Sequence, residues 1–221
     1  MGKNIAIDGP AGAGKSTIAR MLAGQLNYIY VDTGAMYRAM ALYMIEQKVD
    51  VADMQAVTDA CEDIVIDIQY RNGAQQVILN GRNVNDYIRT EEVSQMSSRI
   101  SALPVVREKL LYLQRSLAEA SDVIMDGRDI GTHVLPNADV KIYLTASSHV
   151  RALRRYKELT EKGEDCILEN IEQEITERDQ RDMNRAIAPL RQAEDAVRVD
   201  TSDMNIDEVV SYLNQLIRQY I

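Results

Sequence analysis

Short apolar runs alternate with amphipathic segments along most of this 221-residue chain. The apolar runs predict buried strands near 4–8, 28–31, 123–125, 140–144 and 196–199. The segments between them have a helical period and predict helices at 17–26, 35–47, 50–62, 91–119, 168–185 and 206–220. Strands joined by crossover helices pair in parallel. The pattern therefore predicts an α/β fold, with a central parallel sheet covered by helices on both faces.

Two details refine the helical segments. Met36, Met40 and Met44 recur at helical spacing, which predicts a stripe of side chains in the core. Leu103-Pro104 predicts a break within the long segment 91–119, because proline disfavours helical backbone in the residue before it.

The period changes to two between residues 64 and 84. Isoleucines stand at every second position there, and Asn72-Gly73 and Asn80-Gly81 are typical of tight hairpin turns. These features predict a small antiparallel meander. Because it interrupts the alternation of strands and helices, we interpret residues 60–95 as an insertion into the main domain.

A glycine-rich stretch directly follows the first apolar run. Gly9-Pro10-Ala11-Gly12-Ala13-Gly14-Lys15-Ser16 fits the phosphate-binding pattern G-x-x-x-x-G-K-[ST], between a predicted strand and a predicted helix. Its backbone N–H groups and the helix dipole can point at β- and γ-phosphates. Lys15 can add a charge between those phosphates, and the Ser16 hydroxyl can ligate Mg²⁺. The alternative is a glycine-rich turn without a ligand.

Further charged residues follow other predicted strands. Asp32-Thr33-Gly34 and Asp126-Gly127-Arg128-Asp129 come at strand ends, where ligands bind in open α/β sheets. Arg38 lies one helical turn beyond the first group and can point at the same cleft. Arg178, Asp182 and Arg185 share one side of a predicted helix, a spacing that also suits a ladder of surface ion pairs.

Composition limits the partners. The net charge of −9 argues against a protein that coats a nucleic acid polymer or an anionic membrane, although a local arginine cluster can still bind phosphates. Cys61 and Cys166 form no C-x-x-C pair and suit a reducing compartment. There is no signal-peptide pattern and no apolar run of transmembrane length. We expect a soluble, cytoplasmic protein with one α/β domain, although the length also allows two.

Five motifs together resemble the bacterial cytidylate kinases. They are Gly-Pro-Ala-Gly-Ala-Gly-Lys-Ser at 9–16, Asp-Thr-Gly-Ala-Met-Tyr-Arg at 32–38, Ile-Arg-Thr at 88–90, Asp-Gly-Arg-Asp-Ile-Gly-Thr at 126–132 and Arg-Asp-Gln-Arg-Asp-Met-Asn-Arg at 178–185. The resemblance spans nearly the whole chain. It implies a P-loop kinase with a core (1–59, 96–146 and 166–221), a monophosphate-binding insertion (60–95) and a helical lid (147–165).

The resemblance also implies an activity and partners. The activity is transfer of the γ-phosphoryl of ATP to CMP or dCMP, with Mg²⁺ as the cofactor, and we expect a monomer. It assigns the phosphate loop, Thr17 and the lid residue Arg154 to ATP, and Ser16 to the metal. Which of Arg151, Arg154 and Arg155 reaches ATP stays open at this point.

Nine positions match the acceptor site of the family. They are Thr33, Arg38, Ser98, Arg107, Arg128, Asp129, Arg178, Asp182 and Arg185. Within this set the resemblance implies that arginines 38 and 128 grip the acceptor phosphate, residues 33, 98, 107 and 129 surround the pyrimidine, and residues 178 and 182 lie near the pentose. Position 185 faces either base or phosphate. The catalytic set is Lys15, Arg128, Asp129 and Arg185.

The choice of base has a chemical basis. Cytosine carries an amino donor where uracil carries a carbonyl acceptor. A carboxylate at Asp129 would accept from the amine and repel the carbonyl, and an unmatched buried polar group costs about 1–3 kcal/mol. A kinase for UMP or another monophosphate remains an alternative. So does a P-loop GTPase, although the [NT]-K-x-D run that reads guanine is absent from the sequence.

Overall fold

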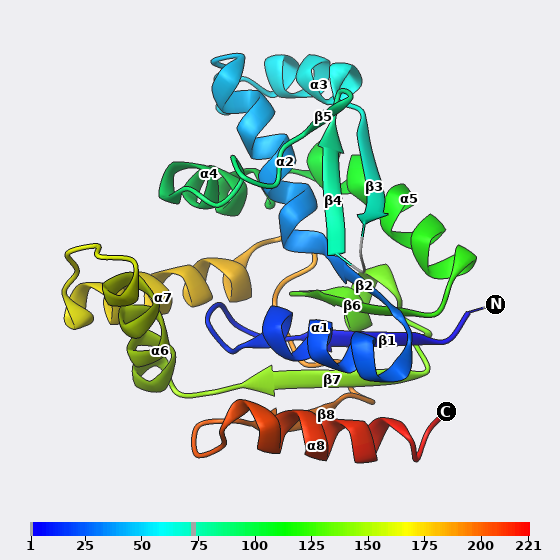
Figure 1. The fold of residues 1–221 in the computed structure, drawn as a ribbon. Helices are drawn as coiled ribbons and strands as arrows, with labels where there is room; N and C mark the ends of the chain where they lie inside the picture. The colour runs from blue at the N-terminus through cyan, green and yellow to red at the C-terminus, as the bar shows by residue number, and fades with distance from the viewer. Residues whose placement is uncertain (1, 72–73) are drawn as a thin grey trace.

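A computed structural model describes residues 2–71 and 74–221. Its central sheet has five parallel strands in the order β2-β6-β1-β7-β8 (Figure 1). The strands are β1 (Asn4–Asp8), β2 (Ile29–Asp32), β6 (Val123–Gly127), β7 (Val140–Thr145) and β8 (Val197–Asp200). The predicted parallel sheet is therefore confirmed. All its strands end at the same edge, where the loops gather.

Alternate residues of each strand face opposite layers of helices. Ile5 and Ile7 pack with α1 (Lys15–Leu26) and α8 (Ile206–Ile217) on one face. Ala6 faces the other layer, which contains helices α2 (Thr33–Glu46), α4 (Glu91–Ile100) and α5 (Pro104–Ala120). The sheet is thus buried on both sides, as its unbroken apolar strands require.

The predicted methionine stripe lies in the larger of these two cores. Met36, Met40 and Met44 of α2 are fully buried against the sheet and against α5. The predicted break at Leu103-Pro104 is also confirmed, because α4 ends at Ile100 and α5 begins at Pro104.

Side-chain caps shift two helix starts from their predicted positions. The helix expected at 50–62 is α3 (Met54–Asp63), because the Asp53 carboxylate accepts from the amides of Gln55 and Ala56 and so begins the helix there. The helix expected from residue 35 begins at Thr33, because Asp32 caps it through the amide of Ala35.

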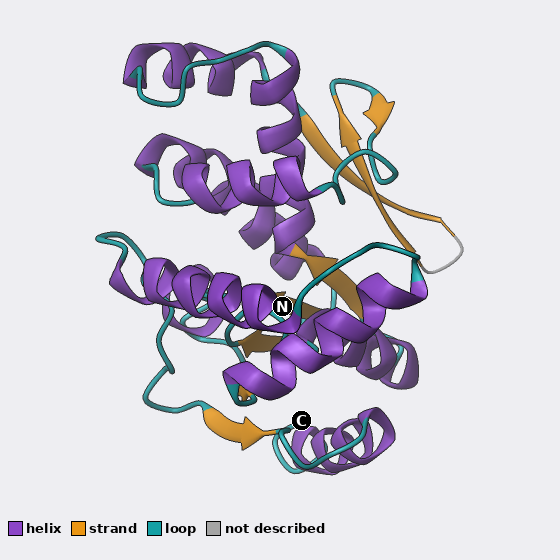
Figure 2. Cartoon of the chain, turned by 90° about the vertical axis from the view of Figure 1, so that its left-hand side faces the viewer, coloured by secondary structure: helices purple, strands orange, loops and turns teal. Residues whose placement is uncertain are grey.

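The predicted meander forms a separate three-stranded antiparallel sheet (Figure 2). Its strands are β3 (Ile66–Arg71), β4 (Ala74–Leu79) and β5 (Arg82–Asn83). Asn80 and Gly81 have φ of 47° and 82°, as a two-residue hairpin turn requires, and confirm the second predicted turn. The first, at Asn72-Gly73, lies outside the described residues.

The three-stranded sheet is bonded to the edge of the central sheet. The Gln75 side chain accepts from the amide of Asp32 at 2.9 Å and donates to its carbonyl at 3.3 Å. The Tyr70 hydroxyl donates to the carbonyl of Tyr30 at 3.1 Å. These side chains continue the hydrogen-bond ladder at the free edge of β2.

Three more helical segments complete the described chain, and one of them is the short π-helix η1 (Ile130–Val134) after β6. Helix α6 (Ser148–Glu161) packs on α7 (Leu168–Asn184) around Ala152, Ile171 and Ile175, a small hydrophobic cluster of their own. In the described ranges, no helix is long and apolar enough to span a bilayer.

Met40→Ala is expected to lower the free energy of unfolding by about 2–5 kcal/mol, because it leaves a cavity in the larger core. Urea denaturation measures the loss. Met54→Ala is the matched control, since Met54 is 45% exposed, and it should change stability by less than about 0.5 kcal/mol. Equal losses in the two variants would contradict the packing described.

Candidate active site

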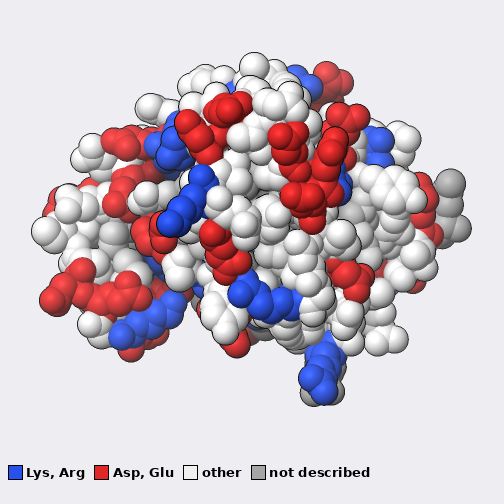
Figure 3. All heavy atoms as spheres, turned by 90° about the horizontal axis from the view of Figure 1, so that it is seen from above, with Lys and Arg blue, Asp and Glu red and all other residues white. Residues whose placement is uncertain are grey.

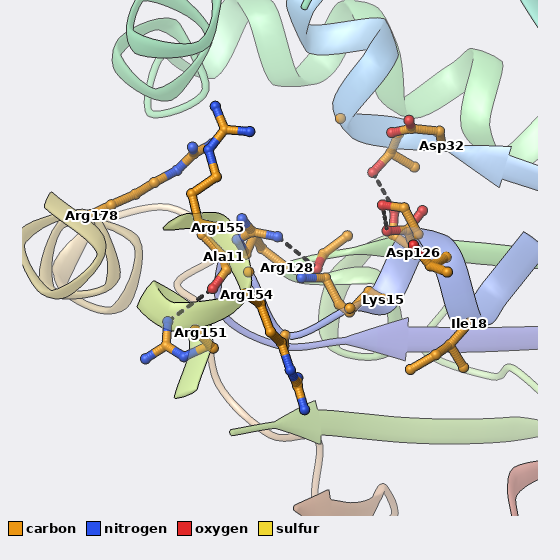
Figure 4. Close-up of a pocket in the computed structure, with 18 of the residues that line it drawn as sticks. Ala11, Lys15, Ile18, Asp32, Asp126, Arg128, Arg151, Arg154, Arg155 and Arg178 are labelled. Atoms are coloured by element: carbon orange, nitrogen blue, oxygen red, sulfur yellow. Dashed lines mark hydrogen bonds between the residues drawn. The ribbon is translucent and has the colours of Figure 1, made fainter. Parts of the chain in front are cut away.

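A cavity of about 830 Å³ opens where the parallel strands end. Its walls come from the loops after β1 and β6, the start of α2, helices α4 to α7 and the turn before α8. Figure 4 shows lining side chains that come from several of these elements. A cavity of this size holds a drug-sized ligand, and ligands bind open α/β sheets at this edge.

Residues 11–16 of the phosphate loop line one end of the cavity and lead directly into α1, whereas the predicted residues Gly9 and Pro10 do not line it. The Lys15 side chain is buried there, and its Nζ donates to the carbonyl of Pro10 at 2.8 Å. Burial, and then the charge of Arg128, lower the pKa of Lys15 to about 7. An anion beside Lys15 would offset this penalty. This end of the cavity therefore fits a phosphate.

A buried carboxylate lies beside the loop. Asp126, at the end of β6, accepts from the hydroxyls of Ser16 at 3.0 Å and Tyr30 at 2.9 Å. Burial, and then the nearby Asp32, raise the pKa of Asp126 to about 6. A cation next to this carboxylate would reverse both effects. The main-chain carbonyl of Asp126 accepts from the Thr33 hydroxyl at 2.7 Å, which ties the start of α2 to the same place.

All nine residues of the predicted acceptor cluster line the other half of the cavity: Thr33, Arg38, Ser98, Arg107, Arg128, Asp129, Arg178, Asp182 and Arg185. Asp129 lies at its centre, where one carboxylate oxygen pairs with Arg107 and the other accepts from Arg185 at 2.9 Å. Arg128 donates to Asp182 at 2.9 Å. These ion pairs join the β6 loop to α5 and α7, so the spacing within α7 is not a surface ladder.

Two further arginines leave donors available to a ligand. Arg38 pairs with Asp32 at 3.1 Å, at the N-terminal end of α2. The buried Nε of Arg178 has no partner within the described residues. Burial, and then Arg128, lower the pKa of Arg178 to about 10. Several guanidinium groups close together in a cavity fit a ligand that carries negative charge.

The three arginines of α6 point in different directions (Figure 4). Arg154 donates to the carbonyl of Thr201 at 2.7 Å and to its hydroxyl at 3.2 Å, near the end of β8. Arg155 pairs with Glu158 at 3.0 Å on the helix surface. Arg151 is buried in the cavity wall, where its Nη1 donates to the carbonyl of Ala11 in the phosphate loop at 2.9 Å. Of these three arginines, Arg154 is the one that bonds to the turn between β8 and α8.

That turn forms part of the cavity that the sequence did not reveal. Thr201, Met204, Asn205 and Ile206 line the cavity next to Arg154. No motif marks them, since they are separated from the phosphate loop by most of the chain. Their only local signal is the capping box in which Asn205 begins α8.

Comparisons with known proteins show the family of the chain. A family model described as cytidylate kinase matches residues 5–219. The chain is 48% identical to the cytidylate kinase of Lactobacillus gasseri, over 97% of this chain and 94% of that one. It is 49% identical to the cytidylate kinase of Caldicellulosiruptor bescii, over 96% and 94%. The chain belongs to the cytidylate kinase family.

A solved shikimate kinase from Acinetobacter baumannii is similar over 99% of this chain and 94% of that one. The TM-score is 0.49 and the identity 16%, so this likeness carries no argument about function.

Membership of the cytidylate kinase family confirms the resemblance drawn from the five motifs. Two further residues at strand ends, Asp32 and Asp126, were given no specific role in the site from the sequence. In this family member both carboxylates line the cavity between the phosphate loop and the acceptor cluster. Within residues 2–71 and 74–221, however, no group of three or more His, Cys, Asp or Glu could hold a metal.

Asp126→Asn is expected to stabilise the ligand-free protein at pH 8 by about 1–3 kcal/mol, with little change at pH 5. The folded-state pKa of Asp126, about 6, lies above the ordinary aspartate value of 3.8. The stabilisation from its protonated form is therefore full below 3.8 and is lost as pH rises through 6. An amide carries no charge to bury, and hydroxyl partners can accept from it.

Urea denaturation at both pH values, with a chelator present and no nucleotide, measures the effect. Asp203→Asn is the control at an exposed position, with an expected change below about 0.5 kcal/mol at either pH. An Asp126→Asn effect of the same size at pH 5 and pH 8 would refute the assigned cause.

Proposed function

We propose that this protein transfers the γ-phosphoryl of ATP to CMP or dCMP and gives CDP or dCDP. One observation carries the proposal: in a chain of the cytidylate kinase family, a single cavity joins the phosphate loop to the nine-residue acceptor cluster. A hydrolase or a nucleotide-dependent switch has no need of the arginines on the acceptor side.

The donor occupies the half of the cavity that the phosphate loop forms. Loop amides and Lys15 bind the β- and γ-phosphates, and Thr17 lines the same wall. Arg154 reaches the donor from α6. The turn at 201–206, which Arg154 contacts, is where we place the donor base.

The metal that accompanies the donor is Mg²⁺. Its fit rests on the Ser16 hydroxyl and on Asp126, a buried carboxylate whose pKa is raised by burial and then by Asp32. Ser16 would ligate the ion and Asp126 would orient its water ligands. With Mg²⁺ bound, negative charge on the phosphates is partly neutralised.

Positioning and cationic stabilisation accelerate the transfer, which needs no covalent intermediate. Lys15 and Arg128 lie between the two halves of the cavity, where charge spreads over the transferring group. Burial and then Arg128 lower the pKa of Lys15 to about 7. A bound triphosphate would raise this pKa again and hold the ammonium group in its charged form for the transfer.

The acceptor lies along the arginine-rich wall. Arg38 and Arg128 each use one edge of the guanidinium on a carboxylate, which leaves other N–H groups for the acceptor phosphate. Arg178 and Asp182 bind the pentose. The pyrimidine lies near Thr33, Ser98, Arg107 and Asp129, with Arg185 at the boundary between base and phosphate.

We expect one segment of the chain to move over the bound nucleotides. The segment 147–165 acts as a lid, 60–95 as the monophosphate-binding insertion, and the remainder as the core. The separate hydrophobic cluster between α6 and α7 supports a lid that moves with part of α7. Closure expels water that could hydrolyse ATP.

We propose a cytoplasmic monomer without nucleic acid polymers or membranes as partners. The face shown in Figure 3 supports this view, because acidic and basic side chains are interspersed there and form no broad basic area. The net charge of −9 has the same implication.

A coupled assay of ADP release with CMP, dCMP, UMP and AMP tests the activity. CMP and dCMP should give the highest kcat/KM. Lys15→Ala should lower kcat at least about a hundred-fold with every acceptor, which excludes a contaminating kinase. Equal rates across the four acceptors, or none above background hydrolysis, would overturn the proposal.

Asp129→Asn tests the base assignment. The variant keeps the shape of the side chain and loses the carboxylate that accepts from the cytosine amine, so kcat/KM for CMP should fall at least about ten-fold. The loss for UMP should be smaller, because uracil has no amine at that place. Steady-state kinetics with both acceptors give the ratio, and equal losses would remove this explanation.

A further inference from the structure

Arg151 differs from the two other arginines of α6 in being almost fully buried, with 5% of its surface exposed. Its Nε donates to the carbonyl of Ala146 at 2.9 Å. Its Nη1 donates to the carbonyl of Ala11 in the phosphate loop at 2.9 Å, the contact drawn in Figure 4. The same nitrogen lies 2.6 Å from a carboxylate oxygen of Asp179. One guanidinium thus joins the phosphate loop, the end of β7 and helix α7.

The partner carboxylate belongs to the buried face of α7. Ile175, Asp179 and Asp182 lie along that face. Asp182 pairs with Arg128 of the acceptor cluster, whereas Asp179 does not line the cavity. The second oxygen of Asp179 is buried without a partner in the part of the chain that the structure describes. Arg151 is therefore what compensates this buried charge.

The hydrogen bond from Arg151 to the Ala11 carbonyl also orients the N–H of Gly12, which belongs to the same peptide group. In a planar trans peptide the carbonyl and the following N–H point in opposite directions. A guanidinium that holds the Ala11 carbonyl outward therefore turns the N–H of Gly12 toward the inside of the loop. Gly12 has φ of +75°, and glycine tolerates either orientation of a neighbouring peptide. Without the arginine, little would prevent that peptide from rotating.

We infer that Arg151 is a positioning residue for the donor: anchored by Asp179, it holds the peptide 11–12 with its N–H aimed at the triphosphate. Arg151 lines the cavity wall, but its Nε and Nη1 are engaged by Ala146, Ala11 and Asp179, so it acts on the donor through the loop. The inference deepens the proposed kinase function and rests on it. It also predicts an effect at a distance: a change at Asp179, on helix α7 of the acceptor side, should weaken the binding of ATP.

Asp179→Asn tests the inference. The KM for ATP, and the Kd for a non-hydrolysable ATP analogue measured by calorimetry, should rise about ten-fold, in line with the loss of one charge-assisted hydrogen bond. The KM for CMP should stay within about two-fold. A distortion of α7 as a whole would instead affect CMP, because Arg178 and Asp182 flank the substituted position.

Two variants complete the design. Glu174→Gln, on the exposed face of α7, should leave both KM values unchanged. Arg151→Lys keeps a charge near Asp179 but loses the planar fork that serves three acceptors at once. It should therefore show an intermediate rise in the KM for ATP. If Asp179→Asn does not fold, the KM for ATP of Arg151→Lys tests the positioning role alone.

The outcomes separate this inference from the proposed function. If the unaltered protein binds no ATP analogue or does not phosphorylate CMP, the proposed function fails. If it does both and the variants leave the ATP parameters unchanged, or raise the KM for CMP as much as that for ATP, Arg151 has no positioning role. A lower thermal stability with unchanged KM values also contradicts the inference.

Discussion

The parallel pairing of β1 with β6 is the constraint on which the site depends. Its register sets Ile7 beside Asp126 and Asp8 beside Gly127, so the phosphate loop and the loop after β6 leave the sheet next to one another. Asp8 strengthens this arrangement, because its buried carboxylate accepts from the amides of Ile130 at 2.8 Å and Gly131 at 2.7 Å. Burial raises the pKa of Asp8 to about 6 even though these amide hydrogen bonds oppose the shift. Donor and acceptor groups are thereby brought together before any ligand binds.

Charge is distributed unevenly around that junction. On the acceptor side Asp129 has two arginine partners, and this buried network is well matched. On the donor side burial lowers the pKa of Lys15 and raises that of Asp126, so both groups are poorly compensated in the free protein. A triphosphate with a divalent cation would supply the missing charges in both places. Ligand binding should therefore stabilise the donor side more than the acceptor side.

Much of the fold followed from local pattern, and the exceptions have local causes. The strands and the methionine stripe of α2 depend on periodicity, which short-range sequence contains. The start of α3 depended on which of two aspartates capped the helix, Asp50 or Asp53, and periodicity does not distinguish them. In the site, the phosphate loop and the acceptor cluster were recognisable because motifs mark them. The turn at 201–206 was not, since its role comes only from its place beside Arg154.

The spacing within each motif and the parallel α/β architecture follow from short stretches of sequence. The five motifs, spread from residue 9 to residue 185, together indicated the family. Which charges are partners depends instead on the tertiary structure. Arg151, Arg154 and Arg155 are the same residue type within five positions of the chain. The first bonds to the phosphate loop, the second to Thr201 after β8 and the third to Glu158 of its own helix. Glu158 is three positions from Arg155. The partners of Arg151 and Arg154, up to 140 positions away, come within hydrogen-bonding distance through the packing of α6 on α7 and on the sheet, which no local pattern encodes.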